Sequence, residues 1–165
     1  MVNIIRGDKL SILHYKGQYQ VEPFKSNFAT ENLTNRFNGE LSEKFPHVHS
    51  TQGHIAFEGR KFPITRIWNL YGPISRGEIT IKKSRTLSLV SYEIDMSKYV
   101  ICNIAILFMA SILMLLSDFT HMFIAVFCIL VLFFLLAAVC ISIINFNSFI
   151  RKTIGAAGGK ILNGV

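Results

Sequence analysis

The run Ile129-Leu-Val-Leu-Phe-Phe-Leu-Leu136 lies at the centre of an uncharged segment, residues 122–144, that decides the fold of this chain. As an α-helix this segment would be about 34 Å long, because each residue adds about 1.5 Å. The hydrocarbon core of a bilayer is roughly 30 Å thick. The segment therefore predicts a transmembrane helix with a slight tilt.

A second uncharged segment, residues 99–117, is also long enough to cross a bilayer as a helix. Only a short loop around Asp118 separates the two segments, so we expect two antiparallel helices that form a hairpin. The alternative is a pair of buried helices in a soluble protein. A chain of 165 residues is too small to surround two helices that are apolar on every side, so we favour the transmembrane hairpin.

Basic residues flank the predicted hairpin on one side only. Lys98 precedes the first span, Arg151 and Lys152 follow the second, and the loop between the spans carries Asp118 without any Lys or Arg. Cytoplasmic loops of membrane proteins are enriched in Lys and Arg. We therefore expect a multi-pass protein of the inner (plasma) membrane with both termini in the cytoplasm. The start of the chain, residues 1–9, does not have the pattern of a signal peptide, which fits an N-terminal domain that is not exported.

The predicted spans contain no Asp, Glu, Lys or Arg. Ion-coupled transporters place ionisable groups at mid-membrane depth, so a transporter that works alone is not expected. Small residues such as Ala110, Ser111 and Ala137 would allow helices to pack closely, within the hairpin or between copies. We interpret the cysteines as apolar packing residues rather than as a disulfide framework or a metal site: Cys102, Cys128 and Cys140.

The charge distribution divides the chain into three parts. The chain has 17 Lys and Arg against 10 Asp and Glu, and most of these residues precede the first span. We assign residues 1–97 to a cytoplasmic domain, residues 98–146 to the hairpin and residues 147–165 to a basic C-terminal tail. Apolar residues of the tail, among them Phe149 and Ile154, recur at roughly helical spacing, so its first part could continue the helix along the membrane interface. Gly155, Gly158 and Gly159 interrupt this pattern, so we expect a frayed end at residues 160–165.

The first half of the N-terminal domain predicts one helix. Its apolar residues recur every four or five positions before Pro46, which ends a helix. We expect an amphipathic helix over about residues 26–38, with room for one more turn beyond Gly39. Residues 10–22 alternate between apolar and polar side chains, which fits either two short strands joined at Lys16-Gly17 or a single strand.

After Pro46 the apolar period changes to two, which is typical of strands. Four strands are predicted, at Gly53–Gly59, Phe62–Trp68, Ile74–Ile81 and Leu87–Ile94. The predicted fold class is therefore α+β: a small antiparallel β-meander domain covered by one amphipathic helix, followed by a two-helix transmembrane hairpin.

Three histidines form the one cluster of potential metal ligands in the N-terminal domain. His47 and His49 would share a face if they lay on a strand, and His54 is close in sequence. No Cys, Asp or Glu nearby completes a convincing ligand set, so we interpret the cluster as a polar loop and predict no metal site.

Basic residues and aromatic residues are interleaved across the predicted sheet. If the basic residues share one face of the sheet, five of them are candidate contacts to the phosphate of a lipid headgroup or of a small ligand: Arg60, Arg66, Lys82, Lys83 and Arg85. The net charge of the N-terminal domain is modest for a nucleic-acid-binding protein, so nucleic acid is the least favoured of the three partners. The sequence has no P-loop, no G-x-S-x-G and no H-E-x-x-H, so we expect neither an enzyme nor a bound cofactor.

One pattern of aromatic, Gly and Pro positions between Gly53 and Glu93 resembles uncharacterised small bacterial membrane proteins. The pattern includes Phe62-x-Ile64-x-Arg66, Tyr71-x-Pro73 and Gly77-x-Ile79. The resemblance implies a β-rich cytoplasmic domain followed by hydrophobic helices, and it implies no activity. In general layout the chain is also similar to bacterial defence effectors that sense a cyclic nucleotide and perforate the inner membrane, although those carry their spans first.

Two functional hypotheses follow. The first is a non-enzymatic membrane protein whose cytoplasmic domain, anchored by the hairpin, binds a protein partner or lipid headgroups. The alternative is a ligand-gated effector, in which a small anionic, nucleotide-like molecule binds the basic sheet and causes hairpins from several copies to disrupt the bilayer.

Overall fold

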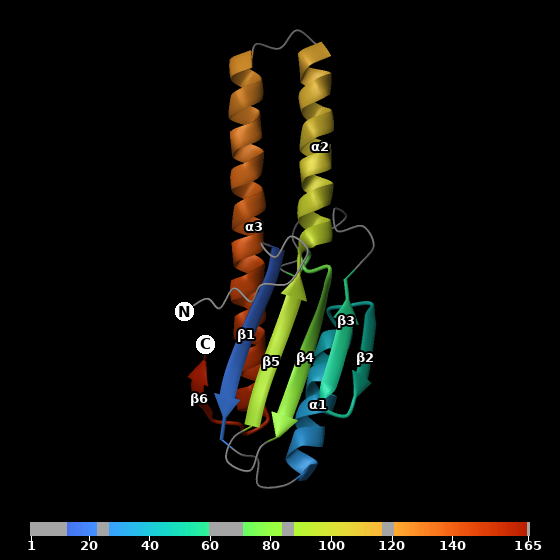
Figure 1. Cartoon of the computed structure of the whole chain (residues 1–165), viewed down its shortest axis with the longest axis vertical. Helices are drawn as coiled ribbons and strands as arrows, with labels where there is room; N and C mark the ends of the chain where they lie inside the picture. Colours follow the sequence, from blue (N-terminus) through green and yellow to red (C-terminus); the bar gives the residue numbers. More distant parts are fainter. Residues whose placement is uncertain (1–12, 23–26, 60–70, 84–87, 117–120, 165) are drawn as a thin grey trace.

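A computed structural model describes residues 13–22, 27–59, 71–83, 88–116 and 121–164. Within these residues the fold is α+β, with a six-stranded antiparallel sheet and three helices, two of which are long and apolar (Figure 1). The strands are β1 (His14–Val21), β2 (His47–Thr51), β3 (His54–Glu58), β4 (Arg76–Lys83), β5 (Ser88–Asp95) and β6 (Ile161–Gly164). The helices are α1 (Asn27–Ser42), α2 (Ser97–Leu116) and α3 (His121–Ala156).

The strand order in the sheet is β2-β3-β4-β5-β1-β6, and every neighbouring pair is antiparallel. β2 and β3 form a tight hairpin, in which Gly53 adopts a φ of 79° that glycine tolerates without strain. β1 and β5 pair along their whole length, from His14 opposite Asp95 to Val21 opposite Ser88. The first described strand of the chain therefore lies inside the sheet, beside the strand that leads directly into α2.

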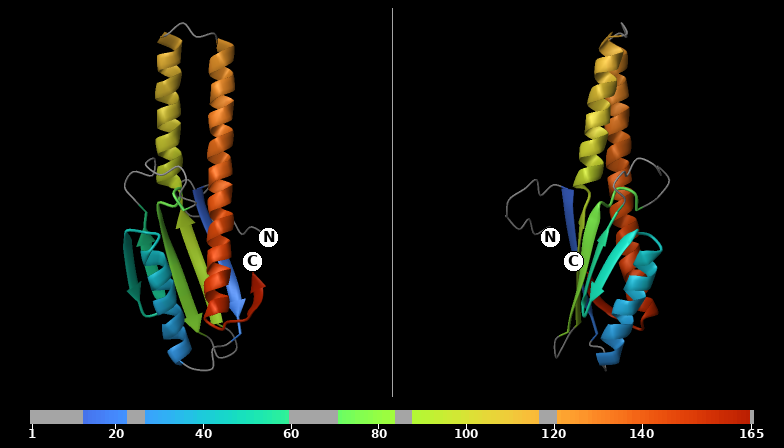
Figure 2. Two further views of the ribbon diagram at one scale, coloured as in Figure 1. Left: turned by 180° about the vertical axis from the view of Figure 1, so that it is seen from behind. Right: turned by 90° about the vertical axis from the view of Figure 1, so that its right-hand side faces the viewer.

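The inner face of the sheet is covered by α1 and by the C-terminal part of α3, which lie side by side on it (Figure 2). Leu33, Phe37 and Leu41 of α1 are fully buried at a spacing of one helical turn. Between the helices and the sheet, Phe45 and Phe57 lie with their ring centres 4.5 Å apart. Each such buried side chain stabilises the fold by about 1.5–3 kcal/mol.

α3 is one unbroken helix of 36 residues, which makes it about 54 Å long. Its C-terminal part contributes Phe146, Phe149, Ile150 and Ile154 to the hydrophobic core. Its N-terminal part projects beyond the sheet beside α2, as the two views of Figure 2 show. A single helix therefore joins the exposed apolar pair of helices to the core of the sheet domain.

The sequence predicted residues 147–165 as a separate basic tail. Of these, the structure describes residues 147–164, which include the end of α3 and strand β6. α3 continues to Ala156, and the chain then turns and returns as β6 beside β1. The Gly159 amide donates to the carbonyl of Ile154 and the Gly158 amide to that of Gly155, both at 3.0 Å, which is a Schellman motif. Gly158 has a φ of 78°, so the glycines end the helix cleanly rather than mark a frayed end.

Other predicted elements differ in extent. Residues 14–21 form a single strand, which is one of the two alternatives, and α1 continues through Gly39 to Ser42. The segment His47-Val48-His49, interpreted as a polar loop, belongs to strand β2, because it pairs with β3 at the edge of the sheet. Three predicted strands correspond to β3, β4 and β5, and the strand expected at residues 62–68 lies outside the described residues.

Two glycines allow a matched test of this packing. A Cβ atom added to Gly17 of β1 would overlap the ring of Tyr92 on β5, whereas a Cβ on Gly39 of α1 meets no atom within 4 Å. Gly17→Ala should destabilise the protein by about 1–3 kcal/mol through overpacking. Gly39→Ala should instead stabilise it by about 0.5–1 kcal/mol, because alanine restricts the unfolded chain. Thermal unfolding of the full chain in detergent measures both, and equal effects of the two changes would contradict this packing of Tyr92.

Candidate functional site

A cluster of polar side chains joins α3 to the inner face of the sheet, close to the level at which α2 begins. We call it the tyrosine cluster, and it consists of five residues from three elements: Tyr15 and Tyr19 of β1, Tyr92 of β5, and Asn147 and Arg151 of α3. Tyr15 and Tyr19 point inward because they occupy alternate positions on β1. Asn147 and Arg151 are one turn apart on α3 and so face the same strands.

Asn147 is the centre of the cluster's hydrogen bonds. Its Oδ1 accepts a hydrogen bond from the Tyr19 hydroxyl at 2.8 Å and another from the Tyr92 hydroxyl. Its Nδ2 donates to the Tyr15 hydroxyl at 3.1 Å. Tyr19 and Tyr92 are each only 3% exposed, so without Asn147 their hydroxyls would lose partners that water does not easily replace.

Arg151 closes the cluster on the solvent side. Its Nε donates to the Tyr19 hydroxyl at 3.0 Å, and its guanidinium carbon lies 5.5 Å from the centre of the Tyr19 ring. This combines a hydrogen bond with a cation–π contact. The hydrogen bond that Arg151 donates to the Tyr19 hydroxyl raises the pKa of the guanidinium group, so the side chain stays cationic at any physiological pH.

The cluster holds Tyr92 in its neutral form. Burial raises the pKa of the Tyr92 hydroxyl far above its ordinary value of 10.0, and the neighbouring hydroxyls of Tyr15 and Tyr19 raise it further. The charge of Arg151 acts in the opposite direction but is outweighed. Tyr92 therefore serves as a hydrogen-bond donor to Asn147, and the arrangement gives no sign of a tyrosinate nucleophile or base.

Polar contacts to α1 hold the other side of α3. The Thr153 hydroxyl donates to Glu40 at 2.9 Å, and Arg36 donates to the carbonyl of Ala156 at 3.0 Å. The second contact satisfies one of the carbonyls left free at the end of the helix. α3 is thus fixed to the sheet by the tyrosine cluster and to α1 by these two bonds.

A second polar group marks the start of α2. Asp95, at the end of β5, accepts a hydrogen bond from the Ser97 amide at 2.8 Å and another from Arg76 at 2.8 Å, and His14 lies 3.6 Å away. Burial alone would raise the pKa of the Asp95 carboxyl, but these donors and the charge of His14 outweigh it, so the pKa is lowered. The carboxylate caps the first turn of α2 and connects that helix to β1 and β4.

Two of the five predicted phosphate contacts, Lys82 and Lys83, lie among the described residues. Lys82 and Lys83 end β4 opposite Leu89 and Ser88, at the far end of the strand from Arg76, which lies near α2. Both side chains are exposed, and as neighbouring residues on a strand they leave β4 on opposite faces. Arg60, Arg66 and Arg85 lie outside the described residues.

The residues predicted to set the topology are exposed on the sheet side of the hairpin. Lys98 lies in the first turn of α2, and Arg151 and Lys152 lie in the part of α3 that covers the sheet. His47 and His49 are exposed on β2, and His54 lies 3.3 Å from the Thr80 hydroxyl. No group of three or more His, Cys, Asp or Glu that could hold a metal ion occurs in the part of the chain that the structure describes.

Comparisons with protein-family models, with characterised proteins and with solved structures found no significant match. The resemblance to small bacterial membrane proteins therefore stays a prediction.

Sequence analysis did not identify the tyrosine cluster. The alternation of side chains in Tyr15-x-Gly17-x-Tyr19 predicts a strand, and it places the two tyrosines on one face of that strand. Nothing in the sequence indicated that Asn147, more than a hundred residues later, would lie between them. Arg151 was recognised only as a flanking charge.

Replacement of Asn147 tests the cluster. Asn147→Ala removes the acceptor shared by Tyr19 and Tyr92 and should destabilise the protein by about 1–3 kcal/mol. Asn145→Ala, two residues earlier on the same helix, is the matched control, and we expect a change within about 0.5 kcal/mol. Denaturant unfolding of both variants in detergent provides the measurement. A similar loss of unfolding free energy in both variants would show that the hydrogen bonds of Asn147 add no stability beyond the helix propensity of the residue.

The raised pKa of Tyr92 predicts a pH dependence. The folded protein keeps this hydroxyl neutral, while the unfolded chain ionises it near pH 10, so its contribution to stability is fully present below pH 10 and is lost as the pH rises above it. The wild-type protein should therefore lose stability above pH 10 more steeply than Tyr92→Phe, by up to about 1.4 kcal/mol per pH unit. Melting temperatures between pH 8 and pH 11 give the comparison, and parallel curves would contradict the assignment.

Proposed function

We propose that this chain is a non-enzymatic integral membrane protein of the bacterial inner (plasma) membrane, in which the hairpin α2–α3 anchors a cytoplasmic sheet domain that binds a protein partner or lipid headgroups. The observation that carries the proposal is the division of α3. Its N-terminal part exposes apolar side chains on the sides that face away from α2, while its C-terminal part lies in the core of the sheet domain.

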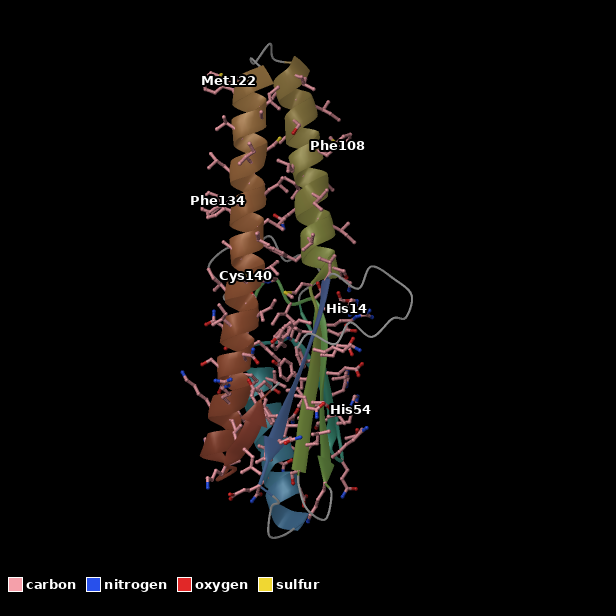
Figure 3. The ribbon with its side chains drawn as sticks, turned by 60° about the vertical axis from the view of Figure 1, so that its left-hand side comes forward. His14, His54, Phe108, Met122, Phe134 and Cys140 are labelled. Carbon is pink, nitrogen blue, oxygen red and sulfur yellow. The ribbon has the colours of Figure 1, made fainter. Side chains whose placement is uncertain are left out.

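The exposed apolar surface favours a bilayer as the surroundings of the hairpin. Phe108, Met122 and Phe134 are 65%, 80% and 68% exposed and point away from the partner helix (Figure 3). Both helices are long and apolar enough to cross a membrane, and only 6% of the most apolar part of α2 and none of that of α3 is buried. Core helices of a soluble protein would be mostly buried. In water this surface would be a site of aggregation.

The length of the apolar surface matches a bilayer. On α3 it runs from Met122 to Ile144, which is 65% exposed, a distance of about 33 Å along the helix. On the same face of α3 the next residues are polar, beginning with Ser148. The apolar part of α2 begins just after Lys98. Because Ser111 lies beside Cys128 across the hairpin, this start is level with about Cys140, roughly 6 Å before Ile144 along α3.

Polar side chains inside the spans bond to their own helices. The Asn103 amide donates to the carbonyl of Tyr99 at 2.8 Å, and the Ser111 hydroxyl donates to that of Leu107 at 2.8 Å. Ser111 also lies 3.4 Å from the sulfur of Cys128, across the hairpin. Such local bonds are required in hydrocarbon, where water cannot satisfy a polar group.

The charges support a cytoplasmic sheet domain. Lys98, Arg151 and Lys152 all lie on the sheet side of the hairpin, and the loop at the other end carries Asp118 without Lys or Arg. By the positive-inside bias the sheet domain faces the cytoplasm. α2 follows β5 after a single residue, Met96, so the domain stands directly at the membrane surface.

The outer face of the sheet is the surface we assign to a protein partner. The helices α1 and α3 lie on the opposite face (Figure 2), and the outer face carries paired charges such as Lys16 with Glu93 at 2.8 Å and Arg76 with Asp95 at 2.8 Å. A mixed, polar surface of this kind suits a specific but reversible protein contact.

Topology is the direct test of the proposal. In a variant with its three native cysteines replaced by alanine, Ser50→Cys on β2 and Asp118→Cys in the hairpin loop place single thiols at opposite ends of the protein. We expect a membrane-impermeant maleimide to label Ser50→Cys in inside-out vesicles only and Asp118→Cys in right-side-out vesicles only. The protein should also stay in the membrane after carbonate extraction. Labelling of both sites from one side, or release by carbonate, would refute the membrane-spanning hairpin.

A further inference from the structure

Arg151 occupies a defined place relative to the apolar surface of α3. Ile144, the last exposed apolar residue, precedes it by two turns, or about 10 Å along the helix axis. At 100° per residue, the two side chains point in directions only about 20° apart, and Ser148 lies between them. Lys152 points about 80° away from Ile144. One face of α3 therefore changes from apolar to polar to cationic, moving away from the hairpin.

The hydrogen bonds show which way Arg151 points. Its Nε bonds to the Tyr19 hydroxyl, which bonds in turn to Asn147, one turn closer to the hairpin. The guanidinium group therefore extends back towards the apolar surface, as side chains on a helix lean towards its N-terminus. Because the side chain is several ångströms long, it brings its charge close to the level where lipid headgroups would lie, since the headgroup regions add about 5–7 Å on each side of the hydrocarbon core.

The charge of Arg151 is held in position but not neutralised. Tyr19 fixes Nε and stacks against the group at 5.5 Å. The side chain is exposed, and among the described residues no carboxylate forms an ion pair with it. Its terminal nitrogens remain available, and their planar arrangement matches two oxygens of a phosphate.

We propose that Arg151, positioned by Tyr19, binds the phosphate of an anionic phospholipid in the cytoplasmic leaflet, while Ile144 contacts the first part of the acyl chains. This inference rests on the proposed membrane-spanning hairpin. A lipid fits better than a soluble phosphate because the cation and the end of the apolar surface lie on one face of the same helix. The headgroup phosphate thus takes the place of a carboxylate partner, which the described residues do not provide for Arg151.

Native mass spectrometry of the full chain, released from nanodiscs that contain phosphatidylcholine with 20% phosphatidylglycerol, tests the inference. The wild-type protein should retain phosphatidylglycerol in preference to phosphatidylcholine. Arg151→Gln should weaken this retention about tenfold, the loss expected for one charge-assisted hydrogen-bonded contact. Lys152→Gln makes the same charge change on the neighbouring residue and should retain the lipid like the wild type.

Tyr19→Phe keeps the aromatic ring but removes the hydroxyl that orients Arg151. Tyr19→Phe should therefore retain less phosphatidylglycerol than Lys152→Gln and more than Arg151→Gln. If Arg151 acted only through its charge, retention by Tyr19→Phe would equal that of the wild type. Inorganic phosphate at 10 mM, a concentration about tenfold above the Kd of a weak anion site, should not displace the lipid. Loss of bound lipid in its presence would assign the site to a soluble anion.

The two proposals fail in different ways. If the protein does not enter nanodiscs and is released from membranes by carbonate, the membrane-spanning hairpin is wrong. If it enters nanodiscs but the Arg151 and Lys152 variants lose phosphatidylglycerol equally, the lipid responds only to net charge and the specific site at Arg151 is refuted. Melting temperatures of both variants in detergent show whether a loss of lipid comes from unfolding.

Discussion

The packing of the C-terminal part of α3 against the inner face of the sheet is the contact on which the rest of the structure depends. Phe146 contacts Phe57 and Tyr92, with ring centres 5.6 and 5.5 Å apart, and Phe149 contacts Phe37 of α1 at 6.0 Å. A sheet with one apolar face must bury it against another layer. α1 covers most of the β2, β3 and β4 side, where Phe57 of β3 also meets Phe146 of α3. β1 and β5 obtain their cover from α3. Without α3 half of the inner face would be open to water.

This packing also explains why polar contacts concentrate on the same part of α3. In a bilayer the hydrophobic effect does not hold one helix against another, because lipid is as apolar as the helices themselves. In the sheet domain burial from water does provide that force. If the hairpin spans a membrane as proposed, the position of the whole helix is therefore decided in the sheet domain. There burial supplies the energy, and hydrogen bonds from Tyr19 to Asn147 and from Thr153 to Glu40 select one rotation about the helix axis. Because α3 is one unbroken helix, the same rotation determines which side chains of its N-terminal part face α2.

The sequence predicted the parts of this structure that depend on local pattern. Two uncharged segments identified α2 and α3, and alternation identified β3, β4 and β5, because burial on one or all sides leaves a direct mark on composition. The C-terminal half of α3 was harder, since Phe146, Phe149 and Ile154 at helical spacing fit a helix on a lipid surface as well as a helix on a sheet. β6 follows Gly158 and Gly159, which suggested a frayed end, although the same residues form the turn that brings β6 back to β1. The tyrosine cluster depends on a pairing between β1 and α3 that no local pattern records.

If the hairpin spans a membrane as proposed, the direction of the strands limits how copies of this protein can associate in it. In Figure 1 the strands run broadly along the same axis as α2 and α3, and β2 forms one edge of the sheet. Antiparallel pairing of two β2 strands would turn the second copy upside down, so its hairpin would point away from the membrane that holds the first. Copies in one bilayer are instead related by an axis along the membrane normal, which keeps their strands parallel and brings equivalent faces of α2 or α3 together. Ala105 and Ala125 are exposed on these helices, and small residues allow the close approach that packing within lipid requires. On this proposed arrangement, self-association is favoured through the hairpin, and the edge and outer face of the sheet are left for the proposed protein partner.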